Sequence, residues 1–296
     1  MRRRLWMAMV LGAGVLLLTG CGFTTQAAVT KPKPKPVKPS VIIPLPKYTI
    51  AETAPSPTGI LWVLAGNAVS KGIYEVSLAD RKIIGSLSVT SDATSIAMSP
   101  TGQLALGAAH GTSGYVEFLS GGTGRVAKTI AVGGAVESLA ASPDAGSFYV
   151  LDRAKKSASV TVINAQSGKI EETVPASPDA VSLADVPGDT GVYYLQPNGL
   201  VSEVAAAGGQ LETQFPIGHS GRALALSPDG NTLYVLKDHG GSDNVAVVDL
   251  ATESVLRAIP VAANATAVTL SPDGSTLYVL VGTPAYGNLQ VVKISS

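Results

Sequence analysis

The chain has 296 residues, of which 46% are hydrophobic and 14% are charged, and its 21 Lys and Arg balance 21 Asp and Glu. This composition excludes a disordered or coiled-coil chain, and the zero net charge argues against a dedicated nucleic-acid-binding protein. The balance conceals a segregation, because residues 1–47 hold eight basic side chains and no acidic one, whereas residues 48–296 hold 13 basic and 21 acidic ones. The sequence therefore predicts a basic leader of charge +8 followed by an acidic domain of charge −8.

Residues 1–20 have the pattern of an export signal. Three arginines precede an apolar run, Leu5–Leu18, that is short for a transmembrane helix. The run ends in an apolar, small, small, Cys motif, Leu18–Cys21, which resembles the lipobox of bacterial lipoproteins. The resemblance implies cleavage before Cys21 and acylation of that cysteine. We therefore expect an extracytoplasmic protein that is held at the bacterial membrane by lipid chains on Cys21.

Cys21 is the only cysteine in the chain. Once it is acylated, no thiol remains for a disulfide, a thiolate nucleophile or a cysteine-ligated metal or haem, so we expect no cofactor and no metal site. Residues 21–47 then form a linker in which lysine and proline alternate over residues 31–36. Proline at alternate positions favours an extended polyproline II conformation, which predicts a stalk. Attraction to anionic envelope polymers, or binding by a proline-recognising partner, are alternative roles.

An internal repeat dominates residues 48–296. A Ser-Pro-Asp-Gly turn or a variant of it recurs at intervals of 43, 43, 44, 41 and 44 residues, which is the length that four short strands and their turns require. Proline presets φ in such a turn and glycine accepts a positive φ. We therefore predict an all-β fold, a β-propeller of about six four-stranded blades. The turns begin at Ser56, Ser99, Ser142, Val186, Ser227 and Ser271.

The last repeat is one strand short. Its expected strands cover residues 265–270, 277–281 and 289–294, after which the sequence as given stops. An outermost strand from the N-terminal side would fill the empty position, and residues 41–45 are the candidate because proline is tolerated on an edge strand. Residues 48–53 would then form the innermost strand of the first blade.

The fifth repeat carries a family resemblance. Leu233–Leu236, Asn244–Val255 and Ala258–Val261 together resemble the YVTN-type β-propeller repeat, and Leu277–Leu280 with Asn288–Val292 is similar to it. The resemblance implies a propeller fold and an exported setting. The family often has seven blades, whereas this chain has repeats for six. Its members include binding proteins, surface proteins and lactonase-like enzymes, so the resemblance assigns no single activity.

Four strands per blade place the connections on two faces. The turn face carries the Ser-Pro-Asp-Gly turns and the third-to-fourth turns, and the loop face carries the second-to-third and inter-blade loops, where propellers usually bind ligands. All three histidines fall on the loop face, and together with nearby charged residues they form the candidate ligand-binding set, without an assigned catalytic or metal-ligating role. The set comprises His110, Asp152, Arg153, His219, Arg222, Asp238, His239 and Asp243.

These observations favour a membrane-anchored extracytoplasmic binding module that recognises an envelope protein or a glycan. One alternative is an exported hydrolase of the lactonase-propeller type, in which a histidine and an arginine of the loop face activate water against a small ester. Another is an envelope assembly factor. The expected domains are a signal peptide over residues 1–20, an acylated stalk over residues 21–47 and a propeller over residues 48–296.

Overall fold

A computed structural model describes residues 41–52, 56, 58–67, 69–89, 92–120, 124–142, 144, 146–188 and 190–294. The predicted signal peptide, Cys21 and the linker up to residue 40 lie outside these residues. Twenty-four strands form six four-stranded antiparallel sheets, and the described residues contain no helix. No segment of the described chain therefore qualifies as a membrane-spanning helix.

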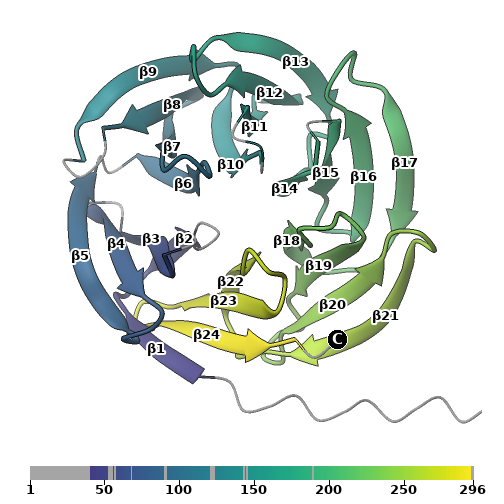
Figure 1. The fold of residues 1–296 in the computed structure, drawn as a ribbon. Coiled ribbons are helices and arrows are strands. Elements are labelled where there is room, and N and C mark those ends of the chain that lie inside the picture. The colour runs from purple at the N-terminus through teal and green to yellow at the C-terminus, as the bar shows by residue number, and fades with distance from the viewer. Residues whose placement is uncertain are drawn as a thin grey trace, which may run out of the picture. The chain divides into compact units, whose positions relative to one another are not determined.

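The six sheets are the blades of a propeller that surrounds a central axis (Figure 1). The prediction of an all-β fold with six four-stranded blades is confirmed.

Within each blade the strands run in order from the axis to the rim. Blade 1 is β2 (Thr49–Glu52), β3 (Ile60–Gly66), β4 (Lys71–Ser77) and β5 (Lys82–Val89); blade 2 is β6 (Ala93–Met98), β7 (Leu104–His110), β8 (Ser113–Leu119) and β9 (Val126–Val132); blade 3 is β10 (Ala135–Ala141), β11 (Ser147–Arg153), β12 (Ala158–Asn164) and β13 (Ile170–Ala176). Blade 4 is β14 (Ser182–Asp185), β15 (Gly191–Leu195), β16 (Leu200–Ala205) and β17 (Leu211–Pro216); blade 5 is β18 (Gly221–Leu226), β19 (Thr232–Lys237), β20 (Asn244–Asp249) and β21 (Ser254–Pro260); blade 6 is β22 (Ala265–Leu270), β23 (Thr276–Gly282), β24 (Gly287–Lys293) and β1 (Val41–Leu45).

Strand β1 closes the ring. It pairs antiparallel with β24 as the outermost strand of blade 6, so one sheet combines the first and the last strands of the described chain (Figure 1). Ile43 and Leu45 are buried on its inner side, whereas Ile42 is 59% exposed. Val41 pairs with Val291 near the end of β24, and Leu45 pairs with Gly287 beside the β23–β24 loop. The chain therefore enters the propeller at the turn face and runs toward the loop face.

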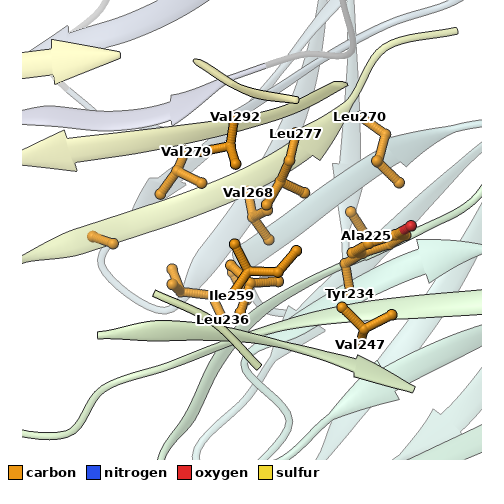
Figure 2. Close-up of a cluster of buried hydrophobic side chains, with 13 residues drawn as sticks. Ala225, Tyr234, Leu236, Val247, Ile259, Val268, Leu270, Leu277, Val279 and Val292 are labelled. Atoms are coloured by element: carbon orange, nitrogen blue, oxygen red, sulfur yellow. The ribbon is translucent and has the colours of Figure 1, made fainter. Parts of the chain in front are cut away.

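The hydrophobic core is divided among the blade interfaces. Six clusters of buried side chains are present, and each joins two neighbouring blades. Between blades 5 and 6, for example, Leu236 faces Val268 and Leu277 (Figure 2). Between blades 2 and 3 the Phe118 and Phe148 rings meet edge to face with their centroids 5.2 Å apart, a geometry that aromatic pairs prefer. The packing of neighbouring blades against each other holds their loops in fixed positions.

The Ser-Pro-Asp-Gly segments form the expected turns. In blade 5, Gly230 N–H donates to Ser227 O at 2.9 Å, and Gly230 has φ 74°. The Asp229 carboxylate accepts from Ser227 Oγ and from Asn231 N–H, and these hydrogen bonds lower the pKa of Asp229. The Ser271 hydroxyl acts likewise in blade 6 and, with the hydrogen bonds from Ser275, lowers the pKa of Asp273 to about 2. The turn aspartates therefore stabilise local structure.

The third-to-fourth turns of blades 1 to 5 share a residue with positive φ. It lies three positions before the bulged residue of the outermost strand, and three of the five blades have glycine there. Blade 1 has Arg81, with φ 57°. A left-handed conformation costs a non-glycine residue about 1 kcal/mol. The residues are Arg81, Gly124, Gly168, Gly209 and Glu253.

Replacing Arg81 with glycine is expected to stabilise the propeller. Relief of the left-handed strain outweighs the greater entropy of glycine in the unfolded chain by about 0.5 kcal/mol, so the melting temperature should rise by roughly 1–2 °C. Arg81→Ala is the matched control, since it removes the same side chain and keeps the strain. Equal melting temperatures for the two variants in differential scanning calorimetry would contradict this account.

Candidate functional site

The innermost strands of five blades are bulged at their loop-face end. The pairing of the first and second strands skips one residue in β2, β6, β10, β18 and β22. A bulge leaves the extra residue unpaired and redirects its side chain. On the loop face, close to the propeller axis, each of these five strands therefore presents one residue that does not pair with the neighbouring strand. These residues are Ile50, Thr94, Glu137, Arg222 and Thr266.

A repeated hydrogen bond joins neighbouring blades on this face. At four blade interfaces, a side chain of one blade donates to a backbone carbonyl in or just before the start of the innermost strand in the next blade. Such a bond uses the acceptor capacity of a backbone carbonyl in the next blade and fixes the two blades in register. The four bonds are Lys71 Nζ to Ala93 O, Thr94 Oγ1 to Val136 O (2.8 Å), Arg153 Nη2 to Ala180 O (2.7 Å) and Arg222 Nη1 to Ala265 O (2.9 Å).

Each of the two arginines in this set also forms an ion pair with a carboxylate. The two ion pairs occupy equivalent positions in their blades, but the acidic and the basic residue have exchanged places. In blade 5 the bulged residue is Arg222, which contacts Asp238 just beyond the end of β19. In blade 3 the bulged residue is Glu137, and its Oε1 lies 3.4 Å from Nε of Arg153 at the end of β11. The side chains of all four residues are 34–40% exposed. A solvated ion pair of this kind adds about 0–1 kcal/mol to stability, so its main effect is to orient each guanidinium.

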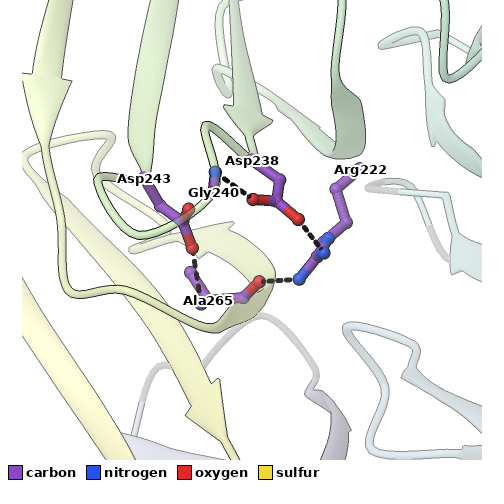
Figure 3. Close-up of polar contacts among 5 residues, drawn as sticks. All are labelled: Arg222, Asp238, Gly240, Asp243 and Ala265. Atoms are coloured by element: carbon purple, nitrogen blue, oxygen red, sulfur yellow. Dashed lines mark hydrogen bonds and ion pairs between the residues drawn. The ribbon is translucent and has the colours of Figure 1, made fainter.

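Figure 3 shows the blade 5 arrangement. Asp238 accepts from the Gly240 N–H at 2.8 Å on one oxygen and from Arg222 on the other. The Gly240 hydrogen bond and the Arg222 charge lower the pKa of Asp238, which keeps this carboxylate ionised. Asp243 accepts from the Ala265 N–H at 2.9 Å, while Arg222 binds the carbonyl of that same residue. The bulge of β18 and the β19–β20 loop are thereby tied to Ala265, the first residue of β22.

Two of the predicted aspartates are buried structural groups. Asp152 is 1% exposed and accepts hydrogen bonds from Ser159 Oγ at 3.0 Å and Thr161 Oγ1 at 2.9 Å. Burial raises the pKa of Asp152, and the hydroxyl donors oppose that rise. Asp243 is 3% exposed. Neither group faces solvent, which removes both from the residues available to a ligand.

The three histidines are placed in different surroundings. His110 lies on blade 2, where its Nδ1 is 3.1 Å from Asp92 Oδ2 and its side chain is 80% exposed. His219 precedes β18, and His239 lies in the β19–β20 loop. Among the described residues, no group of three or more His, Cys, Asp or Glu side chains is arranged to hold a metal ion. Within the part of the chain that the structure describes, the side chains of the loop face therefore do not form a metal-binding cluster.

A pocket of about 550 Å³ lies on the loop face between blades 4 and 5. Its volume is within the range of small-molecule sites, about 300–1,000 Å³. Val181 and Pro197 of blade 4 supply apolar surface, and blade 5 and its preceding loop supply polar groups. Lys237, next to this pocket, donates from Nζ to Ile217 O at 2.9 Å, and burial lowers its pKa. The full lining is Val181, Pro197, His219, Ser220, Gly221, Arg222 and Asp238.

The structure thus divides the predicted set of site residues. His219, Arg222 and Asp238 meet in one pocket, whereas His239 and Asp243 lie in the adjoining loop outside the pocket lining. Asp152 and Arg153 belong to blade 3, and His110 belongs to blade 2. The pocket residues that the sequence analysis missed are Val181, Pro197, Ser220 and Gly221.

One signal in the sequence could have pointed to part of this site. Arg222 and Glu137 each lie five residues before a turn serine, in the position of the bulge, and Val181 holds the corresponding place in blade 4. An alignment of the repeats on the first residue of each turn, which is Val186 in blade 4, brings these three residues together. The apolar contribution of Pro197 comes from a second-to-third loop of variable length and has no comparable signal.

No known protein-family model and no curated protein sequence matches this chain. Its structure is similar to that of hydrazine synthase from Kuenenia stuttgartiensis, with a TM-score of 0.65, over 83% of this chain and 84% of the other. The two sequences are 16% identical. At that identity the likeness shows the propeller fold alone.

Proposed function

We propose that this protein is a lipid-anchored extracytoplasmic binding module that recognises its ligand or partner through the loop face of the propeller. The observation that carries the proposal is the pocket between blades 4 and 5, in which Arg222 and Asp238 stand against the apolar surface of Val181 and Pro197. Concave sites with apolar walls and a few oriented polar groups are typical of ligand recognition.

The contacts of the polar groups favour binding over catalysis. Arg222 is held by Asp238 and by the Ala265 carbonyl, and Asp238 is held in turn by Gly240. A general base needs a pKa near the working pH, whereas the pKa of Asp238 is lowered from its ordinary value. An ionised, hydrogen-bonded carboxylate beside a fixed guanidinium suits recognition by charge and hydrogen bonding.

The direction of the chain is consistent with an anchored module. Val41, the first residue that the structure describes, lies at the turn-face end of β1. The pocket lies on the opposite, loop face. A tether that enters at the turn face leaves the loop face free for a partner.

The anchor is tested with Cys21. Replacing Cys21 with alanine removes the acylation site, so the protein should move from the membrane fraction to the soluble extracytoplasmic fraction. Fractionation followed by immunoblotting measures the change, and Cys21→Ser provides a second variant without a lipid. Continued membrane association of both variants would contradict the lipoprotein proposal.

Pocket-dependent capture tests the binding role. Full-length protein with Arg222→Ala and Asp238→Ala should lose a component that the wild type retains from detergent-solubilised envelopes. Glu137→Ala with Arg153→Ala is the matched control, because it removes the equivalent ion pair of blade 3 and substitutes no residue of the pocket lining. Equal capture by the wild type and the pocket variant, or equal loss in both variants, would contradict recognition through this pocket.

A hydrolase of the lactonase-propeller type is the second candidate, and the presence of both His219 and Arg222 in one pocket favours it. In that case, the protein should hydrolyse members of a lactone and ester panel, and His219→Ala should abolish the activity. His110→Ala is the control, since His110 lies on another blade. A panel without turnover would eliminate this candidate for the substrates used and leave the binding proposal standing.

A further inference from the structure

The chemistry of the pocket indicates what class of ligand it accepts. Arg222 carries five N–H donors, and its described bonds to Asp238 and Ala265 use two of them. Its side chain is 40% exposed. The guanidinium is thus oriented by its partners and keeps donors for a ligand. Such a planar group binds a carboxylate with two parallel hydrogen bonds.

The charge of this sector of the loop face is compatible with an anionic ligand. The loops and strand ends of blades 3 to 5 on this face carry five basic and five acidic side chains, in addition to His219 and His239. Residues 48–296 as a whole carry a net charge of −8. The pocket therefore lies in a sector that is less acidic than the domain as a whole. The five bases are Arg153, Lys155, Lys156, Arg222 and Lys237, and the five acids are Glu137, Asp152, Asp179, Asp238 and Asp243.

Two features restrict the anion further. Asp238 stands in the same pocket and is ionised, so it repels a doubly charged phosphate more strongly than a singly charged carboxylate. Val181 and Pro197 supply an apolar surface that a bare inorganic anion cannot use. Burial of apolar ligand surface contributes about 25 cal/mol per Å², so a ligand with an apolar body gains affinity that a small inorganic ion lacks.

We propose that the pocket between blades 4 and 5 binds a monocarboxylate with a small apolar body, whose carboxylate pairs with Arg222 and whose body lies against Val181 and Pro197. Asp238 acts as the positioning residue for the guanidinium. This inference rests on the proposed binding function and names its ligand class. The same chemistry is present in a free apolar acid and in the carboxyl terminus of a peptide that ends in an apolar residue.

The test uses two probes of nearly the same shape, the charged 3-phenylpropionate and the neutral 3-phenylpropionamide, titrated into the full-length protein by isothermal calorimetry. The carboxylate should bind at least about tenfold more tightly than the amide. Arg222→Gln should remove that preference, and Val181→Trp should block both probes by filling the pocket. Lys82→Gln, at an exposed position on the rim of blade 1, is the control and should bind like the wild type. N-acetyl-alanyl-phenylalanine with a free or an amidated terminus distinguishes a peptide source.

Equal affinities for acid and amide, both lost in Val181→Trp, would overturn the carboxylate class and leave the proposed binding function intact. Undetectable binding of 3-phenylpropionate at millimolar concentration, or carboxylate binding that Arg222→Gln and Val181→Trp leave unchanged, would likewise overturn the inference. Arg222 also bonds blade 6, so the melting temperature of each variant is measured alongside. Val181→Trp, which leaves Arg222 in place, keeps the test decisive if Arg222→Gln unfolds.

Discussion

Replacing Ile43 with alanine should destabilise the propeller by about 3 kcal/mol, the usual cost of truncating a buried isoleucine to alanine. Ile43 is 1% exposed and packs in the cluster that joins blades 6 and 1, with Leu61 and Leu280 among its members. The loss affects the one sheet that connects the beginning of the described chain to its end. The expected fall in melting temperature is roughly 8 °C.

Ile42→Ala is the matched control for this prediction. Ile42 is the preceding residue of β1 and is 59% exposed, so its truncation should change stability by less than about 0.5 kcal/mol. Chemical denaturation of both variants measures the difference. If Ile43→Ala unfolds at the same denaturant concentration as Ile42→Ala, β1 does not close the ring in solution.

Asp152→Ala should destabilise the fold by about 2 kcal/mol. The substitution leaves the Ser159 and Thr161 hydroxyls without the carboxylate that accepts from them inside blade 3. Buried donors without an acceptor each cost about 1–3 kcal/mol, and hydroxyl rotation recovers part of this. Urea denaturation at neutral pH measures the change. Asp179→Ala is the control, because Asp179 is exposed in the next loop and its truncation should be neutral.

The Asp152 account also predicts a pH dependence. Burial raises the pKa of this carboxyl in the folded state, so the folded protein binds its proton more tightly than the unfolded chain does. The contribution of Asp152 is therefore greatest below the unfolded value, about 3.9, and decreases as the pH rises through the folded-state pKa. Relative to Asp152→Asn, the wild type should lose stability over that interval. A constant difference between the two proteins across the interval would contradict the assignment.

The fold followed from the sequence because its signals are local and repeated. Five of the six turns begin with Ser-Pro and the sixth begins with Val-Pro, at a nearly constant interval. Alternating apolar residues on either side of these turns specify short strands. Counting repeats gave six blades, and the strand missing after residue 294 pointed to residues 41–45 for the outermost position.

The partners of the charged residues could not be predicted in this way. Whether Arg222 contacts Asp238 or a ligand depends on a bulge that redirects one side chain and on a loop that returns from β19. Asp152 and Asp238 also look alike in sequence, since both follow a strand of the Tyr-Val-Leu type. The first points into the blade and the second toward the surface, because they differ by one position in the strand and successive side chains alternate.

The central claim is that recognition takes place on the loop face beside blade 5, and site-specific photo-crosslinking in cells of the source organism tests it directly. A photoreactive phenylalanine analogue is placed at His219, in the pocket lining, and separately at Asn231, an exposed turn-face residue of the same blade. The account predicts that a discrete crosslinked product forms from position 219 and that none forms from position 231. Crosslinking from position 231 alone, or the absence of any product from position 219, would contradict it.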